Sequence, residues 1–234
     1  MRFISRLALA ALMVTAALPA SAQTLDDVLR PFVAKYQGRA NGMAVSDLGI
    51  RELKSLGNGR YQLQYSASAM IYTLNETSEF DVRDGVIRPL SYKSDRGSFF
   101  KRRKATLDFD WEKKIGAYFF KEKSGTFALE PNTQDPLTGS LELARLLAPT
   151  KEKYIYREAE KRGIDTNELV LIDQPELNTA VGTVKTWHLE RLHRDPKRKT
   201  EIWLHHQYPA IPLKVHQTDD GDEFQLDIAK FELK

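Results

Sequence analysis

The chain has 234 residues and no cysteine, so disulfides, thiol catalysis and thiolate metal sites are excluded. Its 35 basic and 32 acidic residues give a formal net charge of +3. Two arginines and no acid lie in the first 22 residues, so residues 23–234 carry 33 basic against 32 acidic side chains. This balance gives no electrostatic case for nucleic acid. Residues 23–234 are long enough to form one domain with its own core.

Residues 1–22 have the pattern of a secretory signal. Arg2 and Arg6 precede an apolar run, and Ala20-Ser21-Ala22 offers small residues for cleavage after Ala22. The apolar run is shorter than the about 20 residues of a membrane span. An uncleaved N-terminal anchor is the alternative. We expect a cleaved signal peptide, no transmembrane segment after cleavage, and a location in the bacterial periplasm.

Asp84-Gly85 predicts a two-residue hairpin turn, because both central residues of such a turn need positive φ. The turn would pair Val82 with Ile87 and Phe80 with Pro89.

A second turn at Asp220-Gly221 would pair Val215 with Leu226 and Leu213 with Ile228. This register places apolar residues on one face and polar residues on the other, which is typical of an antiparallel sheet with one face in water.

Two further segments have strand signals. Alternation in RYQLQYSASA (60–69) predicts a strand, and KKIGAYFFKEKSGTFALE (113–130) predicts a hairpin turning near Ser124-Gly125. Leu25 to Val33 reads as a weaker helical or loop segment. In all, we expect roughly ten to twelve strands by these signals.

One segment has helical rather than strand periodicity. In QDPLTGSLELARLLAP, Asp135 is placed to cap a helix over about Pro136–Ala148, and Pro149 ends it. Only Glu142 and Arg145 are charged, so most sides of the helix should be covered. The predicted fold is mainly β: a large curved antiparallel sheet, or incomplete β-barrel, enclosing this one apolar helix.

Three segments carry a family resemblance: FFKRRKATLDFDW (99–111), QDPLT (134–138) and the tail KRKTEIWLHHQYPAIPLKVHQTDDGDEFQLDI (197–228). Together they resemble a bacterial exported family known only as domain of unknown function 3108. The resemblance implies a periplasmic, β-rich, single-domain protein and brings no established reaction or catalytic residues. The architecture is also similar to periplasmic lipoprotein carriers, in which a curved sheet half-encloses a helix, and fold alone does not determine function.

The ligand-binding candidates are Arg103, Phe109, Trp111 and Trp203. In a strand over 99–111, Arg103 shares a face with Phe109 and Trp111, so it is expected to point inward. A buried guanidinium must be paired. It could form a salt bridge to an inward acid or contact carbonyls at the helix end. It could instead clamp a phosphate or carboxylate at the mouth of an apolar cavity.

Other polar groups favour no reaction. Asp108 and Asp110 share a strand face, which we interpret as solvated. The histidines, namely His188, His193, His205, His206 and His216, have parities that point to opposite faces, so we expect no metal site and no cofactor. The basic loop His193–Lys199 is interpreted as a solvated turn, with contact to an anionic membrane surface as the alternative.

These observations predict a non-enzymatic protein that binds an apolar or amphipathic envelope component, such as a lipid or lipidated partner, in a concave sheet face. The first alternative is a scaffold of the cell envelope whose concavity is filled by its own helix. A hydrolase acting on an envelope polymer comes third, because no catalytic constellation is found. The free volume between the helix and the sheet distinguishes the first two hypotheses: an open, lined cavity favours a carrier, and a packed interface favours a scaffold.

Overall fold

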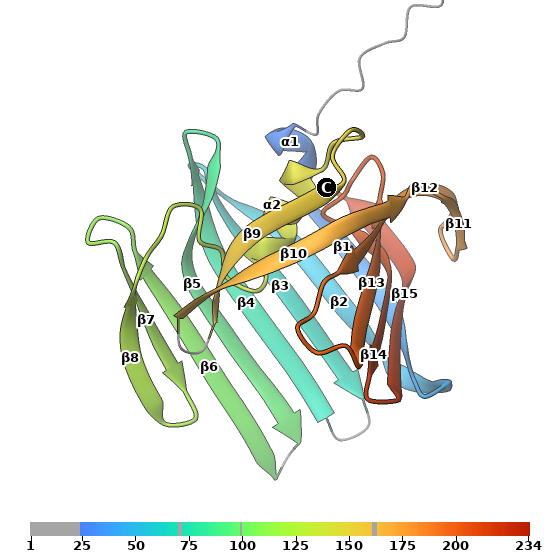
Figure 1. Cartoon of the computed structure of the whole chain (residues 1–234), viewed down its shortest axis with the longest axis horizontal. Coiled ribbons are helices and arrows are strands. Elements are labelled where there is room, and N and C mark those ends of the chain that lie inside the picture. Colours follow the sequence, from blue (N-terminus) through green and yellow to red (C-terminus); the bar gives the residue numbers. More distant parts are fainter. Residues whose placement is uncertain (1–23, 70–71, 99, 161–162) are drawn as a thin grey trace, which may run out of the picture.

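One antiparallel sheet forms most of the molecule (Figure 1). The computed structural model describes residues 24–69, 72–98, 100–160 and 163–234. Mainly β architecture was expected and is confirmed, although the sheet has fifteen strands rather than ten to twelve. The elements are α1 (Leu25–Val28), β1 (Phe32–Ala40), β2 (Met43–Gly57), β3 (Arg60–Ala69), β4 (Tyr72–Arg83), β5 (Val86–Ser98), β6 (Lys101–Asp110), β7 (Ile115–Phe120), β8 (Lys123–Ala128), α2 (Thr138–Leu146), β9 (Lys153–Glu160), β10 (Gly163–Asp173), β11 (Glu176–Thr179), β12 (Gly182–Arg191), β13 (Arg198–His205), β14 (Pro212–Asp219) and β15 (Asp222–Leu233).

Most neighbouring strands in the sheet are also neighbours in the sequence. The strand order is β8-β7-β6-β5-β4-β3-β2-β1-β15-β14-β13-β12-β10-β9, with β11 paired to β12. The first and last strands therefore meet in the middle, where Phe32 pairs with Leu233. The free edges are β8 and β9, so the sheet is curved but not closed (Figure 1). The incomplete barrel is thus confirmed.

The segment after β8 crosses this opening. Gln134 donates its backbone N–H to the Arg157 carbonyl at 2.9 Å and accepts the Ala159 N–H at 2.7 Å. Its side-chain amide donates to the Ile87 carbonyl at 3.1 Å. The connecting segment is therefore tied both to β9 and to the far side of the sheet, and it delivers α2 into the concave face.

Helix α2 occupies the concave face as expected, but it is shorter than the expected Pro136–Ala148. Asp135 Oδ1 accepts the N–H groups of Leu137 and Thr138, at 2.8 and 2.9 Å, so a turn precedes the first helical residue. Leu147 is already extended, which suits a chain approaching Pro149. Leu141 and Ala144 are fully buried against the sheet. In the described residues no helix is long and apolar enough to span a membrane.

The predicted hairpin registers are confirmed. Val82 pairs with Ile87 and Phe80 with Pro89 across Asp84-Gly85, and both turn residues have positive φ. Val215 pairs with Leu226 across Asp220-Gly221, again with positive φ at both turn residues. Strand β3 covers the expected residues 60–69.

The expected turn at Ser124-Gly125 is wrong. The turn between β7 and β8 is formed by Lys121 and Glu122, which have φ of 48° and 65°. Gly125 instead lies within β8 opposite Tyr118, where an added Cβ would approach the Tyr118 ring to 2.7–2.8 Å. This glycine makes room for an aromatic ring rather than for a turn.

The expected strand count is too low because charge-rich strands such as β9 (KYIYREAE) lack a clean apolar alternation. Segment 25–33 contains the single helical turn α1, in which Thr24 and Asp27 form a capping box, followed by the start of β1. The predicted signal peptide and its cleavage point lie outside the described residues.

Candidate ligand-binding site

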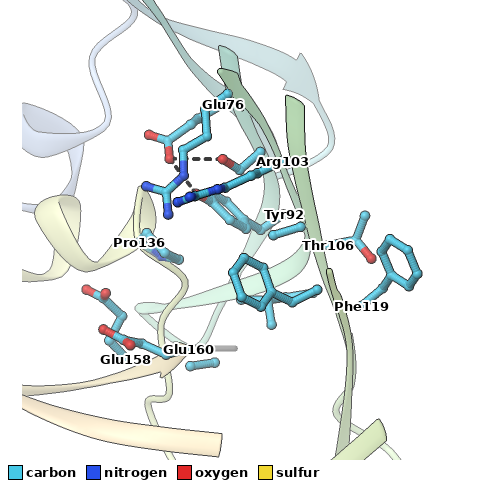
Figure 2. A pocket seen from close by; sticks show the side chains of 14 residues that line it. Glu76, Tyr92, Arg103, Thr106, Phe119, Pro136, Glu158 and Glu160 are labelled. Atoms are coloured by element: carbon cyan, nitrogen blue, oxygen red, sulfur yellow. Dashed lines mark hydrogen bonds between the residues drawn. The ribbon is translucent and has the colours of Figure 1, made fainter. Parts of the chain in front are cut away.

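A cavity of about 210 Å³ lies on the concave face beside α2 (Figure 2). Strands β5, β6 and β7 form one wall, and Pro136 and the end of β9 form the other. The lining is a mixture of polar and apolar side chains. The polar and charged lining residues are Glu76, Tyr92, Ser94, Arg96, Arg103, Thr106, Glu158 and Glu160; the apolar ones are Ala105, Leu107, Phe119, Phe120, Pro136 and Ala159.

Two arginines face each other at one side of this cavity. Arg96 on β5 and Arg103 on β6 are direct partners in the sheet register, and Arg103 extends toward the cavity in Figure 2. Like charges directly opposite each other destabilise a strand pair. Among the residues that the structure describes, no ion pair or side-chain hydrogen bond joins either guanidinium to a carboxylate. The pair therefore keeps its donors available for an anion.

A second hollow of about 220 Å³ continues from the first and shares Arg96 and Arg103 with it. Its other lining residues are Tyr72, Gly97, Ser98 and Lys101, at the free end of the β5–β6 hairpin. The arginine pair thus lines both hollows, and the second hollow also has Lys101 in its lining.

Glu76 lines the same cavity and accepts hydrogen bonds from two neutral donors of its own wall. The Tyr92 hydroxyl donates to Glu76 Oε1 at 2.6 Å, and Ser94 Oγ does so at 3.4 Å (Figure 2). Burial, together with the charge and hydrogen bond of Glu76, raises the pKa of Tyr92 well above its usual value, so the tyrosine remains a donor. One of the acids in the lining is thereby satisfied within its own wall.

The facing wall contains a carboxyl group that titrates near neutrality. Glu158 on β9 is buried and accepts a hydrogen bond from Asn167 Nδ2 at 2.9 Å. Burial raises the pKa of Glu158 to about 7, although the charge of Arg191 acts in the opposite direction. In its protonated form Glu158 does not repel an anion from the cavity, and it supplies an O–H donor.

Asp135 is a second buried acid, but its carboxylate oxygens already accept hydrogen bonds from Ser78 and from the start of α2. Its carboxylate accepts the Ser78 hydroxyl at 2.5 Å and the two N–H groups that begin α2. Burial raises the pKa of Asp135 to about 6 against the effect of these hydrogen bonds. Its role is to anchor the helix rather than to bind a ligand.

The four sequence-predicted residues do not form one site. Arg103 lines the cavity, as the strand parity predicted, but it is exposed rather than buried. Phe109 lies toward the other end of β6 and stacks on Trp111 at 6.2 Å. Trp111 donates from Nε1 to the Pro89 carbonyl at 2.7 Å and lines a separate hollow of about 460 Å³ with Arg88. Trp203 stacks on His188 at 4.2 Å, away from the cavity.

Sequence reasoning missed Arg96 and Glu158, and signals for both exist. Arg96 would follow from Arg103 once Ser98 and Lys101 are recognised as partners in the β5–β6 hairpin, since the register then places the two arginines opposite each other. Glu158 has the same strand parity as the buried Tyr154, which indicates an inward carboxyl group.

The five histidines do not form a single cluster, and two of them, His205 and His206, point to opposite faces as their parity predicts. His206 stacks on Trp187, whereas His205 Nδ1 accepts the N–H groups of Gln207 and Tyr208. In the described residues no group of three or more histidines and acids could hold a metal ion.

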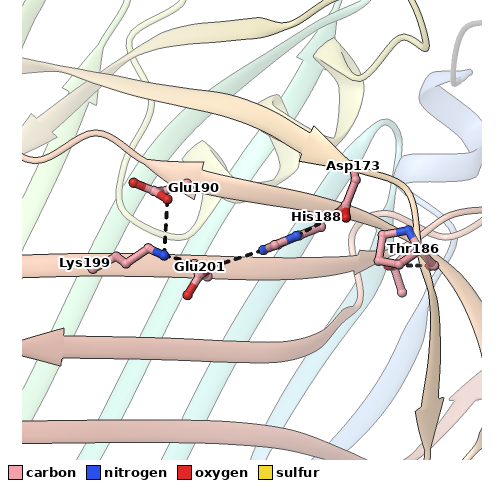
Figure 3. A network of polar contacts seen from close by, with 7 residues as sticks. Asp173, Thr186, His188, Glu190, Lys199 and Glu201 are labelled. Carbon is pink, nitrogen blue, oxygen red and sulfur yellow. Dashed lines mark hydrogen bonds and ion pairs between the residues drawn. The ribbon is translucent and has the colours of Figure 1, made fainter.

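Two histidines instead join a chain of polar contacts across five strands, and Figure 3 shows its part from Asp173 through His188 and Glu201 to Lys199. His188 lies between Asp173 at 2.8 Å and Glu201 at 3.4 Å. His216 lies between Glu201 at 3.6 Å and Glu223 at 2.9 Å. Burial alone would raise the pKa of Glu201, but the hydrogen bond and charge of Lys199, with His188, lower it overall. The chain ties β10 and β12 through β13 and β14 to β15.

The candidate acids Asp108 and Asp110 do not form a reactive pair. The Asp110 carboxylate accepts hydrogen bonds from Lys113 Nζ at 2.8 Å and from the Lys113 backbone N–H at 2.9 Å. The hydrogen bond from the Lys113 side chain holds the pKa of Asp110 below its usual value. Asp108 is exposed.

Comparison with known proteins agrees with this architecture. The family described as "Protein of unknown function (DUF3108)" matches residues 58–229, which is more than half of the chain. The chain belongs to this family. The DUF3108 match spans most of the sheet, α2 and all the cavity-lining residues. No curated protein matches the chain.

One solved structure similar to this DUF3108 chain is a beta-barrel-like protein of the domain of unknown function DUF1849 from Brucella abortus. It has 11% sequence identity and a TM-score of 0.59, and the match covers 88% of this chain and 98% of the other. At this identity the similarity supports the fold and carries no ligand or activity.

Proposed function

We propose that this DUF3108 protein is a non-enzymatic, exported binding protein of the bacterial periplasm whose concave face holds a small amphipathic anion. The single observation that carries the proposal is the arginine couple Arg96–Arg103, which has no ion pair within the described residues and lines a cavity with apolar side chains in it. Two adjacent guanidinium groups suit a carboxylate or phosphate, which can accept several charge-assisted hydrogen bonds at once. The signal-like residues 1–22 support export.

The interior of the cavity suits an apolar tail. Leu107 and Ala159 face it from opposite walls, and Phe120 adds an aromatic surface. The cavity is small compared with typical ligand pockets of about 300–1,000 Å³, so the tail must be short or must extend into the second hollow. Fatty acids and single-chain phospholipids both combine an anionic head group with one apolar tail, so either class fits the cavity.

The closest rival is an envelope scaffold, and one observation favours it. The interface between α2 and the sheet is filled: Leu141 and Ala144 are fully buried there, and Arg51 Nη2 donates to Ser140 Oγ at 2.5 Å. The cavity therefore lies beside the helix rather than beneath it. A hydrolase is less well supported, because Asp135 is occupied by the helix cap and Glu158 by Asn167.

The test is native mass spectrometry of the protein exported to the periplasm and purified without detergent, followed by titration with laurate and with lauroyl lysophosphatidylglycerol. We expect a bound anionic amphiphile at one per chain. The double variant Arg96→Gln/Arg103→Gln should bind at least tenfold more weakly, since each lost charge-assisted hydrogen bond is worth about 1.5–3 kcal/mol.

Arg88→Gln is the matched control, because Arg88 lines the separate hollow near Trp111. A bare mass together with no binding of either amphiphile would overturn the proposal in favour of the scaffold. Binding of laurate but not of the lysophospholipid, or the reverse, would identify the head group.

A further inference from the structure

The free end of the β5–β6 hairpin has the composition of a membrane-docking tip. Phe100, in the turn, is 89% exposed, a larger fraction than for any other large apolar side chain in the described parts of the chain. The hairpin projects from the open end of the sheet, opposite the end that holds α1 (Figure 1). Tyr72, at the start of the adjoining strand β4, is 47% exposed.

Cations surround this aromatic side chain on both faces of the hairpin. Lys101 and Arg103 have the inward parity of β6, and Arg102 and Lys104 have the outward parity. The nearby acid Asp95 is bound by Arg102 at 2.9 Å. No ion pair of Lys101 or Lys104 is found in the parts of the chain that the structure describes. The tip therefore has a net positive charge that its own acids do not cancel.

The other basic run, His193–Lys199, differs in this respect. Arg194 is paired with Asp165 at 2.9 Å, Lys197 with Asp220 at 2.7 Å, and Lys199 with Glu201 at 3.1 Å. Its cations are thus neutralised within the molecule. Of the two basic segments, the hairpin tip is the one that presents uncompensated charge together with an apolar side chain.

We propose that the β5–β6 hairpin tip docks on the surface of an anionic phospholipid bilayer. Phe100 enters the interfacial region, where aromatic side chains are favoured. Lys101 and Lys104 lie over the phosphate groups, to which each cation near the surface adds roughly 1 kcal/mol of attraction. Two such cations and one aromatic side chain produce reversible binding, not insertion.

This surface does not depend on the cavity being a ligand site. If the proposed function also holds, docking at the hairpin tip would bring the ligand-binding arginines close to the bilayer. The second hollow with Arg96 and Arg103 opens at the same hairpin end and includes Lys101 in its lining. An anionic amphiphile leaving a bilayer at the tip would meet the arginine pair first.

The experiment is flotation of the full chain with vesicles made of equal parts phosphatidylethanolamine and phosphatidylglycerol, compared with vesicles of phosphatidylcholine alone. We expect binding to the anionic vesicles only, weakening as salt is added. Lys101→Gln/Lys104→Gln should lower the partition coefficient about thirtyfold, and Phe100→Ser about tenfold. The matched controls are Arg194→Gln/Lys197→Gln and Ile172→Ser, which change equivalent groups away from the tip.

A second readout identifies the tip directly. The chain has no cysteine, so Phe100→Cys and Leu56→Cys can each be labelled at one position with the environment-sensitive dye NBD. Leu56 is 50% exposed near the opposite end of the sheet. A blue shift with anionic vesicles at position 100 but not at position 56 is expected. Absence of vesicle binding by the wild-type chain, equal loss in the control variants, or an equal shift at both positions would overturn the proposal. Ligand titrations in solution remain unaffected by this outcome.

Discussion

The least compensated charge in the interior is the guanidinium of Arg51. It is 7% exposed, and its Nε atom has no hydrogen-bond partner in the described residues. Burial lowers the pKa of Arg51, while Tyr36, Tyr65 and Glu76 act in the opposite direction. A buried charge without a carboxylate at contact distance costs stability, so this residue is retained at an energetic disadvantage. Its bond to Ser140 fixes the first turn of α2 against β2.

Glu158 makes the stability of the fold depend on pH. Its pKa rises from 4.5 in the unfolded chain to about 7 in the fold, so between these values the folded state holds a proton that the unfolded state has lost. The free energy of unfolding therefore falls as the pH rises through this window. Glu158→Gln should be more stable than the wild type at pH 8, by on the order of 1–3 kcal/mol, and similar to it near pH 4.

Urea unfolding at several pH values measures this difference, with the exposed Glu112→Gln as the control. Asp135 contributes a parallel slope between 3.8 and about 6 in all three proteins. An unchanged pH slope in Glu158→Gln would mean that Glu158 ionises freely in the fold.

At the scale of elements, strands β7 and β8 pack against each other through two pairs in which a glycine on one strand faces an aromatic ring on the other. Gly125 lies opposite Tyr118, and Gly116 lies opposite Phe127, whose ring occupies the space that a Cβ would take. This arrangement lets each ring cover the neighbouring strand's backbone at the free edge of the sheet.

Gly125→Val should therefore destabilise the fold, by about 1–3 kcal/mol, although valine favours strands. The cost arises from the clash with the Tyr118 ring. It should largely disappear in a Tyr118→Ser background, which a double-mutant cycle of thermal or urea unfolding would measure. An equal cost in both backgrounds would refute the role assigned to the ring.

The hairpin turns show where sequence reasoning succeeds and where it fails. Asp84-Gly85 and Asp220-Gly221 were correctly predicted as turns because their flanking strands alternate cleanly. At Lys121-Glu122 no turn-forming residue is present, and the conformation is imposed by the pairing on either side. Arg103 was predicted to face inward from parity alone. The cavity wall opposite it comes from β9, far away in the sequence, and parity within one strand cannot reveal that contact.

At the scale of the whole molecule, the first and last strands meet in the centre of the sheet. The Lys234 N–H donates to the Pro31 carbonyl at 2.9 Å, next to the Phe32–Leu233 pair. The start of β1 and Lys234 are therefore close in space. The true edges of the sheet, β8 and β9, are instead neighbours in the sequence.

A circular permutant that joins Lys234 to Thr24 through a short Gly-Ser linker, with new ends between Lys121 and Glu122, should keep the fold. Circular dichroism and cooperative thermal unfolding would check this. A permutant opened at Ser140 is the control and should not fold, because it interrupts α2 between its Asp135 cap and Arg51. Equal behaviour of both permutants would contradict the described topology.

Because β1 pairs with β15, a strand that is made early has to wait for a strand that is made late before the sheet is complete. Strand β1 is among the first parts of the chain to be made, yet one of its two sheet partners consists of 12 residues at the very end. Until these residues are available, the two halves of the sheet cannot be joined and Ile228 cannot enter the core. Such long-range closure is slow compared with hairpin formation. For a chain exported as proposed, the two halves of the sheet can be joined only after β15 has been released.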